Sequence, residues 1–247
     1  PWNYPFFLAI SPLTSAIAAG NRVMIKQASN SQNLCKLLHK LVSEKISEDL
    51  IAFLPGVPSN DFSTLPFNHL IFTGSPNVGK TIMETASKNL VPVTLELGGK
   101  SPTILGDDFN IDTAVERIMY TKLMNSGQTC VAPDYLFVPE GKVDQFVEKA
   151  KAVVKNRYPV LKTKDYTSVI DEKAYNRLMA TLEDAQSKNA DLIRLIPGAE
   201  ADESLRKISP TLITSVTDDM IVMQEEIFGP LFPIMTYKNP QEVIDYI

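Results

Sequence analysis

Two short segments of the sequence carry the side chains best suited to covalent chemistry. Cys130 closes the polar segment Asn125-Ser126-Gly127-Gln128-Thr129-Cys130, which follows a helical pattern. Glu96 ends an apolar run and is followed by Leu97-Gly98-Gly99-Lys100. A thiolate attacks carbonyl carbons, and a carboxylate can act as a general base. The pair therefore suggests a cysteine nucleophile with a glutamate base, although a single cysteine is more often a small buried apolar residue.

Two further segments combine polar, aromatic and turn-forming residues in a way that packing alone does not explain. The first is Pro1-Trp2-Asn3-Tyr4-Pro5, and the second is Glu225-Glu226-Ile227-Phe228-Gly229-Pro230. Each of the four segments taken alone is compatible with an ordinary structural role. Their combination in one chain is what points to a functional site.

A fifth segment, residues 74–81, fits the phosphate-binding pattern G-x-x-x-x-G-K-[ST] at every position. It follows an apolar run and precedes a helical pattern, so the N–H groups of a helix N-terminus could meet phosphate oxygens. A P-loop nucleoside triphosphatase acting through Gly74 to Thr81 is therefore one alternative. Against it, at least two strands come earlier, and Asp107 is the only candidate Mg²⁺ ligand. The same glycine spacing suits the pyrophosphate of a dinucleotide.

Six motifs occur in the order and spacing of the aldehyde dehydrogenase superfamily, which the sequence resembles over essentially its whole length. They are P-W-N at 1–3, G-N-x-V-x-x-K at 20–26, F-T-G-S at 72–75, E-L-G-G-K at 96–100, G-Q-x-C at 127–130 and E-E-I-F-G-P at 225–230. Residues 1–6 and 125–135 look most like the branch that contains coniferyl and fatty aldehyde dehydrogenases. The resemblance implies a truncated α/β fold: a Rossmann-like NAD(P)-binding portion at 1–98 and an α/β catalytic domain at 99–247.

The same resemblance implies the NAD(P)-dependent oxidation of an aldehyde to a carboxylic acid. Cys130 would attack the aldehyde, and its backbone N–H with the side-chain amide of Asn3 would stabilise the resulting oxyanion. Transfer of hydride to the nicotinamide would leave a thioester, which Glu96 would hydrolyse as general base. Aromatic (coniferyl-like) and medium-chain aldehydes are both compatible with the sequence.

NAD or NADP is the cofactor that the resemblance implies. Ser75 and the helix behind it would meet the pyrophosphate, Glu226 would bind the nicotinamide ribose, Phe228 would pack near the ring, and Lys26 would reach the adenosine ribose. For Lys100, a role as an ion-pair residue is an equal alternative to one in the site. The residues assigned to cofactor binding are Trp2, Lys26, Ser29, Gly74, Ser75, Gly79, Leu97, Gly98, Glu226 and Phe228.

One departure from the family pattern bears on cofactor choice. The family often reads K-P-x-E, with the glutamate holding the ribose hydroxyls, whereas this chain reads Lys26-Gln27-Ala28-Ser29. Ser29 removes a negative charge that would repel a 2′-phosphate, while Lys26 remains to attract one. We therefore expect NADP⁺ to be tolerated at least as well as is usual in the family.

The elements that must position these residues follow from the alternation of apolar runs and helical patterns, which predicts an α/β fold with a largely parallel sheet. Ser31 and Asp112 are expected to cap helices. Helices are expected near 13–19, 32–42, 76–88, 112–119, 143–155 and 172–188. Strands are expected near 22–26, 50–54, 69–73, 91–97, 102–105, 135–138, 192–196 and 231–237.

Composition narrows the classes of partner. The net charge of −5 argues against nucleic acid, and no apolar run is long enough to span a membrane. Two widely spaced cysteines argue against a disulfide framework and for a reducing, cytoplasmic location. We expect no metal site, an aldehyde as the small-molecule partner, and a homodimer in the full-length protein.

Both ends of the sequence look cut, because it opens at Pro1 without Met and ends in a helical pattern after Pro240. We therefore expect a piece of a longer polypeptide, and a catalytically inactive fragment is one alternative. A hydrolase that pairs Cys130 with His39 or His69 is another, although neither histidine has the flanks of a cysteine protease.

Overall fold

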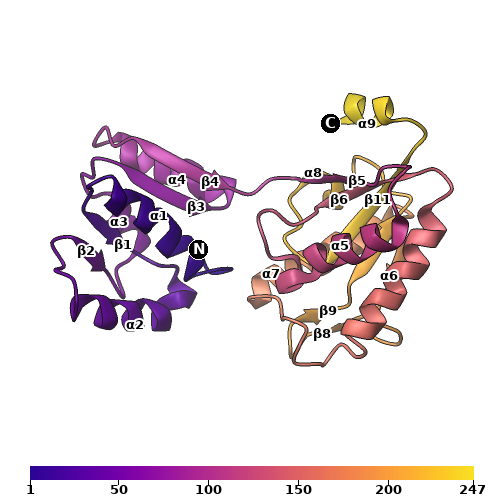
Figure 1. Ribbon diagram of the computed structural model, residues 1–247, viewed down its shortest axis with the longest axis horizontal. Helices are drawn as coiled ribbons and strands as arrows, with labels where there is room; N and C mark the ends of the chain where they lie inside the picture. The colour runs from indigo at the N-terminus through magenta and orange to yellow at the C-terminus, as the bar shows by residue number, and fades with distance from the viewer. The chain divides into compact units, whose positions relative to one another are not determined.

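The computed structural model describes residues 1–247 and divides the chain into two compact units (Figure 1). Unit 1 is Pro1–Gly98 and unit 2 is Gly99–Ile247. Neither unit contains a helix with the length and apolar character needed to cross a membrane.

Unit 1 alternates helices and strands, which form two separate two-stranded parallel sheets, β1–β2 and β3–β4. Two small apolar clusters stabilise it: one joins α1 and α2 to β1 and β2, and the other joins α4 to β3. The elements in chain order are α1 (Phe7–Ala18), β1 (Val23–Ile25), η1 (Ser29–Ser31), α2 (Gln32–Ser43), β2 (Ile51–Phe53), α3 (Ser59–Ser63), β3 (Leu70–Gly74), α4 (Pro76–Ser87) and β4 (Val93–Leu97).

Unit 2 is built on one five-stranded sheet with the order β5-β6-β11-β10-β7 and a small antiparallel hairpin, β8–β9. The sheet is parallel except for the edge strand β7, as the sequence predicted. The elements are β5 (Pro102–Ile104), α5 (Ile111–Leu123), η2 (Met124–Gly127), β6 (Tyr135–Pro139), α6 (Val143–Arg157), α7 (Glu172–Ser187), β7 (Asp191–Arg194), β8 (Ala201–Asp202), β9 (Lys207–Ile208), β10 (Thr211–Thr214), α8 (Ile221–Gln224), β11 (Leu231–Tyr237) and α9 (Pro240–Tyr246).

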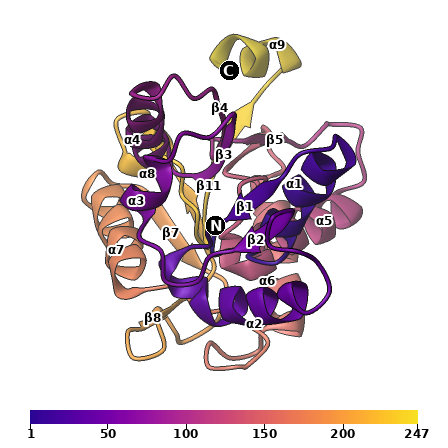
Figure 2. The same ribbon diagram turned by 90° about the vertical axis from the view of Figure 1, so that its left-hand side faces the viewer.

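Both faces of this sheet are buried, because the side chains of a strand alternate between its two faces. Leu136 and Val138 of β6 pack with α5 and α6 on one face, whereas Tyr135 and Phe137 pack with α7 and α8 on the other. The two groups of helices therefore lie on opposite faces (Figures 1 and 2). The sheet is a rigid base for the loops at its strand ends.

Some element boundaries differ from the sequence-based expectations for identifiable reasons. The first helix begins at Phe7 and carries Pro12 in its interior, although proline is expected near a helix start. The helix expected to be capped by Asp112 is capped by Asn110, whose side chain accepts from the N–H of Thr113. Asp112 pairs instead with Lys149 of α6.

Candidate functional site

The loop that carries Cys130 has an unusual backbone conformation. Within residues 124–130, here called the cysteine loop, Asn125 and Ser126 have φ of 53° and 58°, and Gly127 follows at 76°. For residues other than glycine this left-handed conformation costs about 1–2 kcal/mol each. Such strain persists only where surrounding contacts hold the backbone in place. The contacts of this loop therefore determine where the thiol lies.

Gln128 ties the cysteine loop to the body of unit 2. The residue is 2% exposed. Its Nε2 donates to the carbonyl oxygens of Asn125 at 2.9 Å and Ser168 at 3.1 Å, and its Oε1 accepts from the N–H of Ile170 at 2.9 Å. Both amide donors are thus used. The sequence motif contains Gln128 but does not indicate this function, because Ser168 lies 40 positions away.

Gly127 brings the cysteine loop against residues 225–230, here called the acidic turn. A Cβ at Gly127 would lie 2.3 Å from the carbonyl oxygen of Gly229 and 3.1 Å from that of Lys122. Gly229 is equally confined, since a Cβ there would lie 2.5 Å from Leu178 of α7. Glycine is needed at both positions for this close approach. Two segments about 100 positions apart in sequence therefore form one packed site.

Cys130 itself is partly exposed, whereas the other cysteine, Cys35, is 0% exposed in the core of unit 1. The neighbouring Val131 is 72% exposed, so the end of the loop is open to solvent. The backbone N–H of Cys130 donates to no carbonyl oxygen in the structure. A reactive thiol must be reachable by its substrate, and of the two cysteines only Cys130 meets that condition.

The acidic turn is fixed through its backbone. The N–H of Ile227 donates to Asp134 Oδ1 at 3.0 Å, and its carbonyl oxygen accepts from Arg177 Nη2 at 2.7 Å. Phe228 follows with a left-handed φ of 46°. Burial raises the pKa of Glu226, and the nearby Asp134 adds to the increase. A hydrogen bond from the N–H of Gly99 acts in the opposite direction on the same carboxylate.

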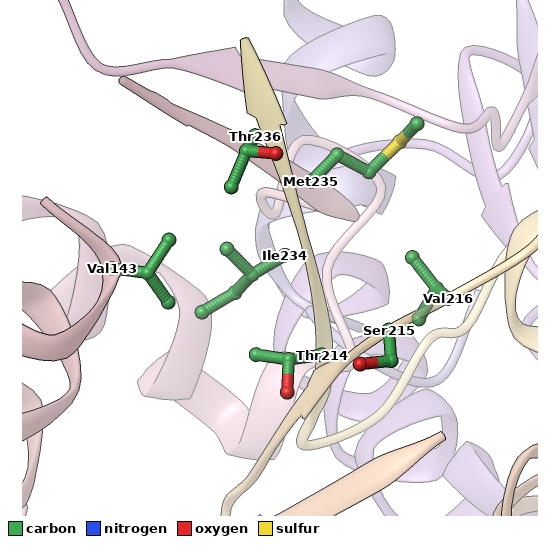
Figure 3. A pocket seen from close by; sticks show the side chains of 7 residues that line it. All are labelled: Val143, Thr214, Ser215, Val216, Ile234, Met235 and Thr236. Carbon is green, nitrogen blue, oxygen red and sulfur yellow. The ribbon is translucent and has the colours of Figure 1, made fainter. Parts of the chain in front are cut away.

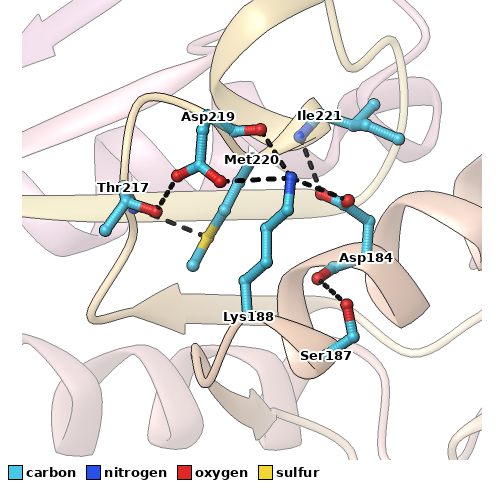
Figure 4. Close-up of polar contacts among 7 residues, drawn as sticks. All are labelled: Asp184, Ser187, Lys188, Thr217, Asp219, Met220 and Ile221. Carbon is cyan, nitrogen blue, oxygen red and sulfur yellow. Dashed lines mark hydrogen bonds and ion pairs between the residues drawn. The ribbon is translucent and has the colours of Figure 1, made fainter.

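The chain reaches the acidic turn through α8, whose start is anchored to the end of α7 (Figure 4). Asp184 Oδ2 accepts from the N–H of Ile221 at 2.8 Å. Lys188 Nζ lies 3.0 Å from Asp184 Oδ1 and donates to the carbonyl oxygen of Asp219 at 2.6 Å. The hydrogen bond from Ile221, followed by that from Lys188, lowers the pKa of Asp184. These contacts hold the N-terminal end of α8.

A cavity of about 410 Å³ lies elsewhere in unit 2 (Figure 3). It is lined by the ends of β10 and β11 and by the first residue of α6: Thr214, Ser215, Val216, Ile234, Met235, Thr236 and Val143. The cysteine loop precedes β6 and the acidic turn precedes β11, and these strands are parallel. The cavity therefore lies at the carboxyl end of the sheet, and the two loops lie at its amino end. None of the predicted site residues lines it.

In unit 1, the segment 74–81 does not form a phosphate-cradling loop. β3 ends at Gly74 and α4 begins at Pro76, so only Ser75 separates them. A P-loop needs several loop residues whose N–H groups surround the phosphate. Gly79 is buried within α4, and a Cβ there would lie 2.9 Å from Leu97 Cδ2. Close packing of α4 on β4 therefore explains Gly79, and the triphosphatase alternative is wrong.

Several predicted residues of unit 1 do meet at the carboxyl ends of β3 and β4. Thr73 is in register with Glu96, and Gly74 with Leu97. Glu96 is exposed. Ser75 precedes α4, and no side chain caps that helix. Helix N-termini leave backbone N–H groups without partners, and ligands of parallel sheets bind at carboxyl strand ends. This edge has the features of a phosphate-binding site.

Lys26 and Ser29 lie on another part of unit 1. Lys26 Nζ donates to Ser59 Oγ at 2.5 Å. Burial is the main cause of a lowered pKa of Lys26. Ser29 is exposed at the start of η1. Position 29 thus carries a hydroxyl in place of the glutamate carboxylate that would repel a phosphate group.

The N-terminal segment is tied to the same region through Gln27. Its Nε2 donates to the carbonyl oxygen of Pro5 at 2.9 Å, and the residue is 3% exposed. Trp2 and Asn3 are both partly buried. Gln27 thus links the P-W-N motif to the segment that carries Lys26.

Both histidines have hydrogen-bond partners within unit 1. His39 Nδ1 lies 3.0 Å from the carbonyl oxygen of Phe53, and His69 Nε2 lies 2.8 Å from Thr94 Oγ1. No group of three or more His, Cys, Asp or Glu side chains is arranged to hold a metal ion. Neither histidine shows the cysteine partner that a Cys–His hydrolase requires.

Comparison with known protein families matches residues 1–247 to the aldehyde dehydrogenase family. A probable coniferyl aldehyde dehydrogenase of Pseudomonas aeruginosa is 47% identical over 250 residues, which are 100% of this chain and 52% of that protein. The chain thus spans about half the length of the curated relatives it matches.

Solved structures give the same result. The substrate-bound AldH of Staphylococcus aureus has a TM-score of 0.89 and 41% identity, covering 100% of this chain and 54% of that one. An aldehyde dehydrogenase of Mycobacterium tuberculosis complexed with NAD⁺ has a TM-score of 0.87 and 28% identity, covering 99% and 52%.

Proposed function

We propose that this chain, which belongs to the aldehyde dehydrogenase family and has its fold, carries the reactive part of an enzyme that oxidises an aldehyde to a carboxylic acid with NAD(P)⁺. The sequence predicted both the family and the fold. The observation that carries this proposal is the accessible Cys130 on a strained loop that is held by the buried, hydrogen-bonded Gln128. Such a loop holds a nucleophile in one position before substrate arrives, which is how enzymes lower the entropic cost of reaction.

Cys130 reacts first in the proposed mechanism. Its thiolate adds to the aldehyde carbon, and the carbonyl oxygen becomes the oxyanion of a hemithioacetal. The N–H of Cys130, which donates to no backbone carbonyl oxygen, is proposed as one donor for that oxyanion, and the side-chain amide of Asn3 is proposed as the second. The oxidation needs a hydride acceptor, which NAD(P)⁺ would supply when bound. What remains on Cys130 is a thioester.

Glu96 completes the proposed cycle. As general base it takes a proton from a water molecule, whose oxygen attacks the thioester carbon. The carbon–sulfur bond breaks, the carboxylic acid leaves, and Cys130 is regenerated. The exposure of Glu96 at a strand end of unit 1 supports this role, because the base must be reached by water.

The remaining motif residues are proposed to bind the cofactor. The uncapped start of α4 at Ser75 fits a pyrophosphate, with Gly74, Leu97 and Gly98 at the same strand ends. Glu226 fits a ribose hydroxyl as a hydrogen-bond acceptor, and Phe228 fits the nicotinamide ring. Lys26 is assigned to the adenosine ribose and Trp2 to the shape of the site.

Ser29 gives the cofactor proposal a specific test. A 2′-phosphate should be tolerated because the nearest charged motif residue is Lys26 and no carboxylate occupies position 29. We expect Ser29→Glu to weaken NADP⁺ binding about tenfold and to change NAD⁺ binding little, as titration of both cofactors would show. Strong rejection of NADP⁺ by the unchanged protein would contradict the proposal.

The substrate is proposed to be an aromatic, coniferyl-like aldehyde or a medium-chain aliphatic one, and the complete protein is proposed to be a homodimer. The experiment that tests the function follows NAD(P)H absorbance with coniferyl aldehyde, using this chain and the complete polypeptide. Signal from the complete polypeptide is expected. Silence in both would defeat the proposal, whereas silence in this chain alone would identify an inactive fragment.

A further inference from the structure

A partly buried ion pair lies beside the acidic turn, and the mechanism proposed above does not use it. Lys100 Nζ lies 2.6 Å from Asp134 Oδ2, and the two side chains are 19% and 5% exposed. Removing two charges from water is costly, and such a pair is weak evidence for stability by itself. The structures that the pair holds in place are therefore the better guide to its function.

All three N–H bonds of the Lys100 ammonium group are used within unit 2. Besides Asp134, Nζ donates to the carbonyl oxygen of Val222 at 2.7 Å and to that of Glu225 at 3.0 Å. These carbonyls lie at the end of α8, where helical backbone has no internal partners for them. Since an ammonium group has three donors, none is left for an aldehyde or a phosphate. Lys100 therefore acts on the turn and does not bind a ligand.

Asp134 holds the same turn from the other side. Its Oδ1 accepts from the N–H of Ile227 at 3.0 Å, while its own N–H donates to the carbonyl oxygen of Ser101 at 2.9 Å. Lys100 thus hydrogen-bonds to the backbone of the residue before Glu226, and Asp134 hydrogen-bonds to the backbone of the residue after it. Glu226 is fixed on both sides by one ion pair.

We propose that the Lys100–Asp134 pair positions the acidic turn so that Glu226 and Phe228 face the nicotinamide half of the cofactor. Both members of the pair are positioning residues, because they touch the backbone of the turn. This inference rests on the proposed function. It also accounts for the lysine of the E-L-G-G-K motif, which the sequence left divided between a site role and an ion-pair role.

The test uses the complete polypeptide with the variants Lys100→Met and Asp134→Asn. Lys142→Met is the matched control, because Lys142 forms an exposed pair with Asp107 at the same N–O distance of 2.6 Å. We expect the dissociation constant for NAD(P)⁺ to rise about tenfold or more in both variants, since removal of one member frees the turn. Hydrolysis of p-nitrophenyl acetate in the absence of cofactor, which proceeds through an acyl group on Cys130, should stay within about twofold of the wild-type rate in both variants. The control should change neither quantity.

Two results would overturn the inference. One is unchanged cofactor affinity in both variants, and the other is an equal loss of ester hydrolysis, which would show that the pair supports the cysteine loop. Asp134→Asn conserves shape and decides the question where Lys100→Met does not fold. A wild-type protein that binds no NAD(P)⁺ would defeat the proposed function itself, and wild-type binding with unaffected variants would defeat the inference alone.

Discussion

The two units of the chain differ in how much buried structure supports their part of the proposed site. Unit 2 has one five-stranded sheet with an extensive apolar cluster on each face, whereas unit 1 has two two-stranded sheets with small clusters. The loop that carries Cys130 is largely buried and hydrogen-bonded. Glu96 and Ser75 lie exposed at strand ends of unit 1.

This difference indicates that the two units position their parts of the proposed site in different ways. The position of the thiol is set by packed backbone, left-handed residues and the buried Gln128. The proposed base, Glu96, and the proposed phosphate site lie at exposed strand ends of unit 1. Changes in unit 2 should therefore affect both stability and the first chemical step, and changes in unit 1 should affect turnover with little effect on stability.

The largest expected effect is that of Cys130→Ser. A hydroxyl is a far weaker nucleophile than a thiolate, so aldehyde oxidation and cofactor-independent ester hydrolysis should both fall about a thousandfold or more. Steady-state rates of the two reactions provide the measurement. Cys35→Ala is the control, since Cys35 is buried in unit 1. Loss of both activities in Cys35→Ala, with both retained in Cys130→Ser, would contradict the assignment of Cys130 as the nucleophile.

Glu96→Gln should have the next largest effect, and only on the last step. We expect kcat to fall about 10²–10⁴-fold, because water is no longer activated. The thioester still forms, so rapid mixing should show a burst of NAD(P)H followed by slow turnover. Glu84→Gln, at another exposed glutamate of unit 1, is the control. A burst-free loss of rate would show that Glu96 acts before the thioester forms.

Gly127→Ala tests the packing of the cysteine loop. The new Cβ would lie 2.3 Å from the backbone of Gly229, and φ is 76°, so strain and overpacking together should cost about 4 kcal/mol. Gly141→Ala has a similar φ of 85° with nothing within 4 Å, and it should cost only about 1 kcal/mol. Urea unfolding measures both. Equal losses of unfolding free energy in the two variants would mean that the contact between the cysteine loop and the acidic turn does not contribute to stability.

Lys122→Met tests the buried charge beside the same loop. Lys122 is 1% exposed, and burial lowers its pKa from 10.5 to about 8. Between these values the unfolded chain holds a proton that the folded chain has lost, so the free energy of unfolding rises with pH across the window, by on the order of 3 kcal/mol. The destabilisation is fully present below about pH 8. The variant should lose this rise in urea unfolding from pH 8 to 10.5, whereas an unaltered slope would show that Lys122 is not the group responsible.

Much of the fold could be predicted from the sequence, because the spacing of apolar residues in a long segment indicates whether it forms a helix or a strand. β11 spans the seven residues expected for it, and α7 ends within one residue of the prediction. The short β10 and α8 were not predicted, since a few residues show no period. Asn110 rather than Asp112 caps α5 because capping depends on where the chain turns, which composition does not show.

The sequence predicts only part of the proposed site. The motifs predict Cys130 and Glu226 as site residues by residue type and spacing. Gln128, Lys100 and Asp134 acquire their roles from partners up to 125 positions away, which only the folded chain brings together. The phosphate-loop pattern fits by spacing alone, although the helix expected near 76–88 already contains Gly79, as α4 does in the structure.

The central claim is that a substrate acyl group passes through a thioester on Cys130, and peptide mass spectrometry tests it most directly. The complete polypeptide carrying Glu96→Gln would be mixed with aldehyde and NAD(P)⁺, quenched in acid and digested. We predict the added mass of the acyl group on the peptide that contains Cys130 and none on the peptide that contains Cys35. NAD(P)H formed without any acylated Cys130 would contradict the account.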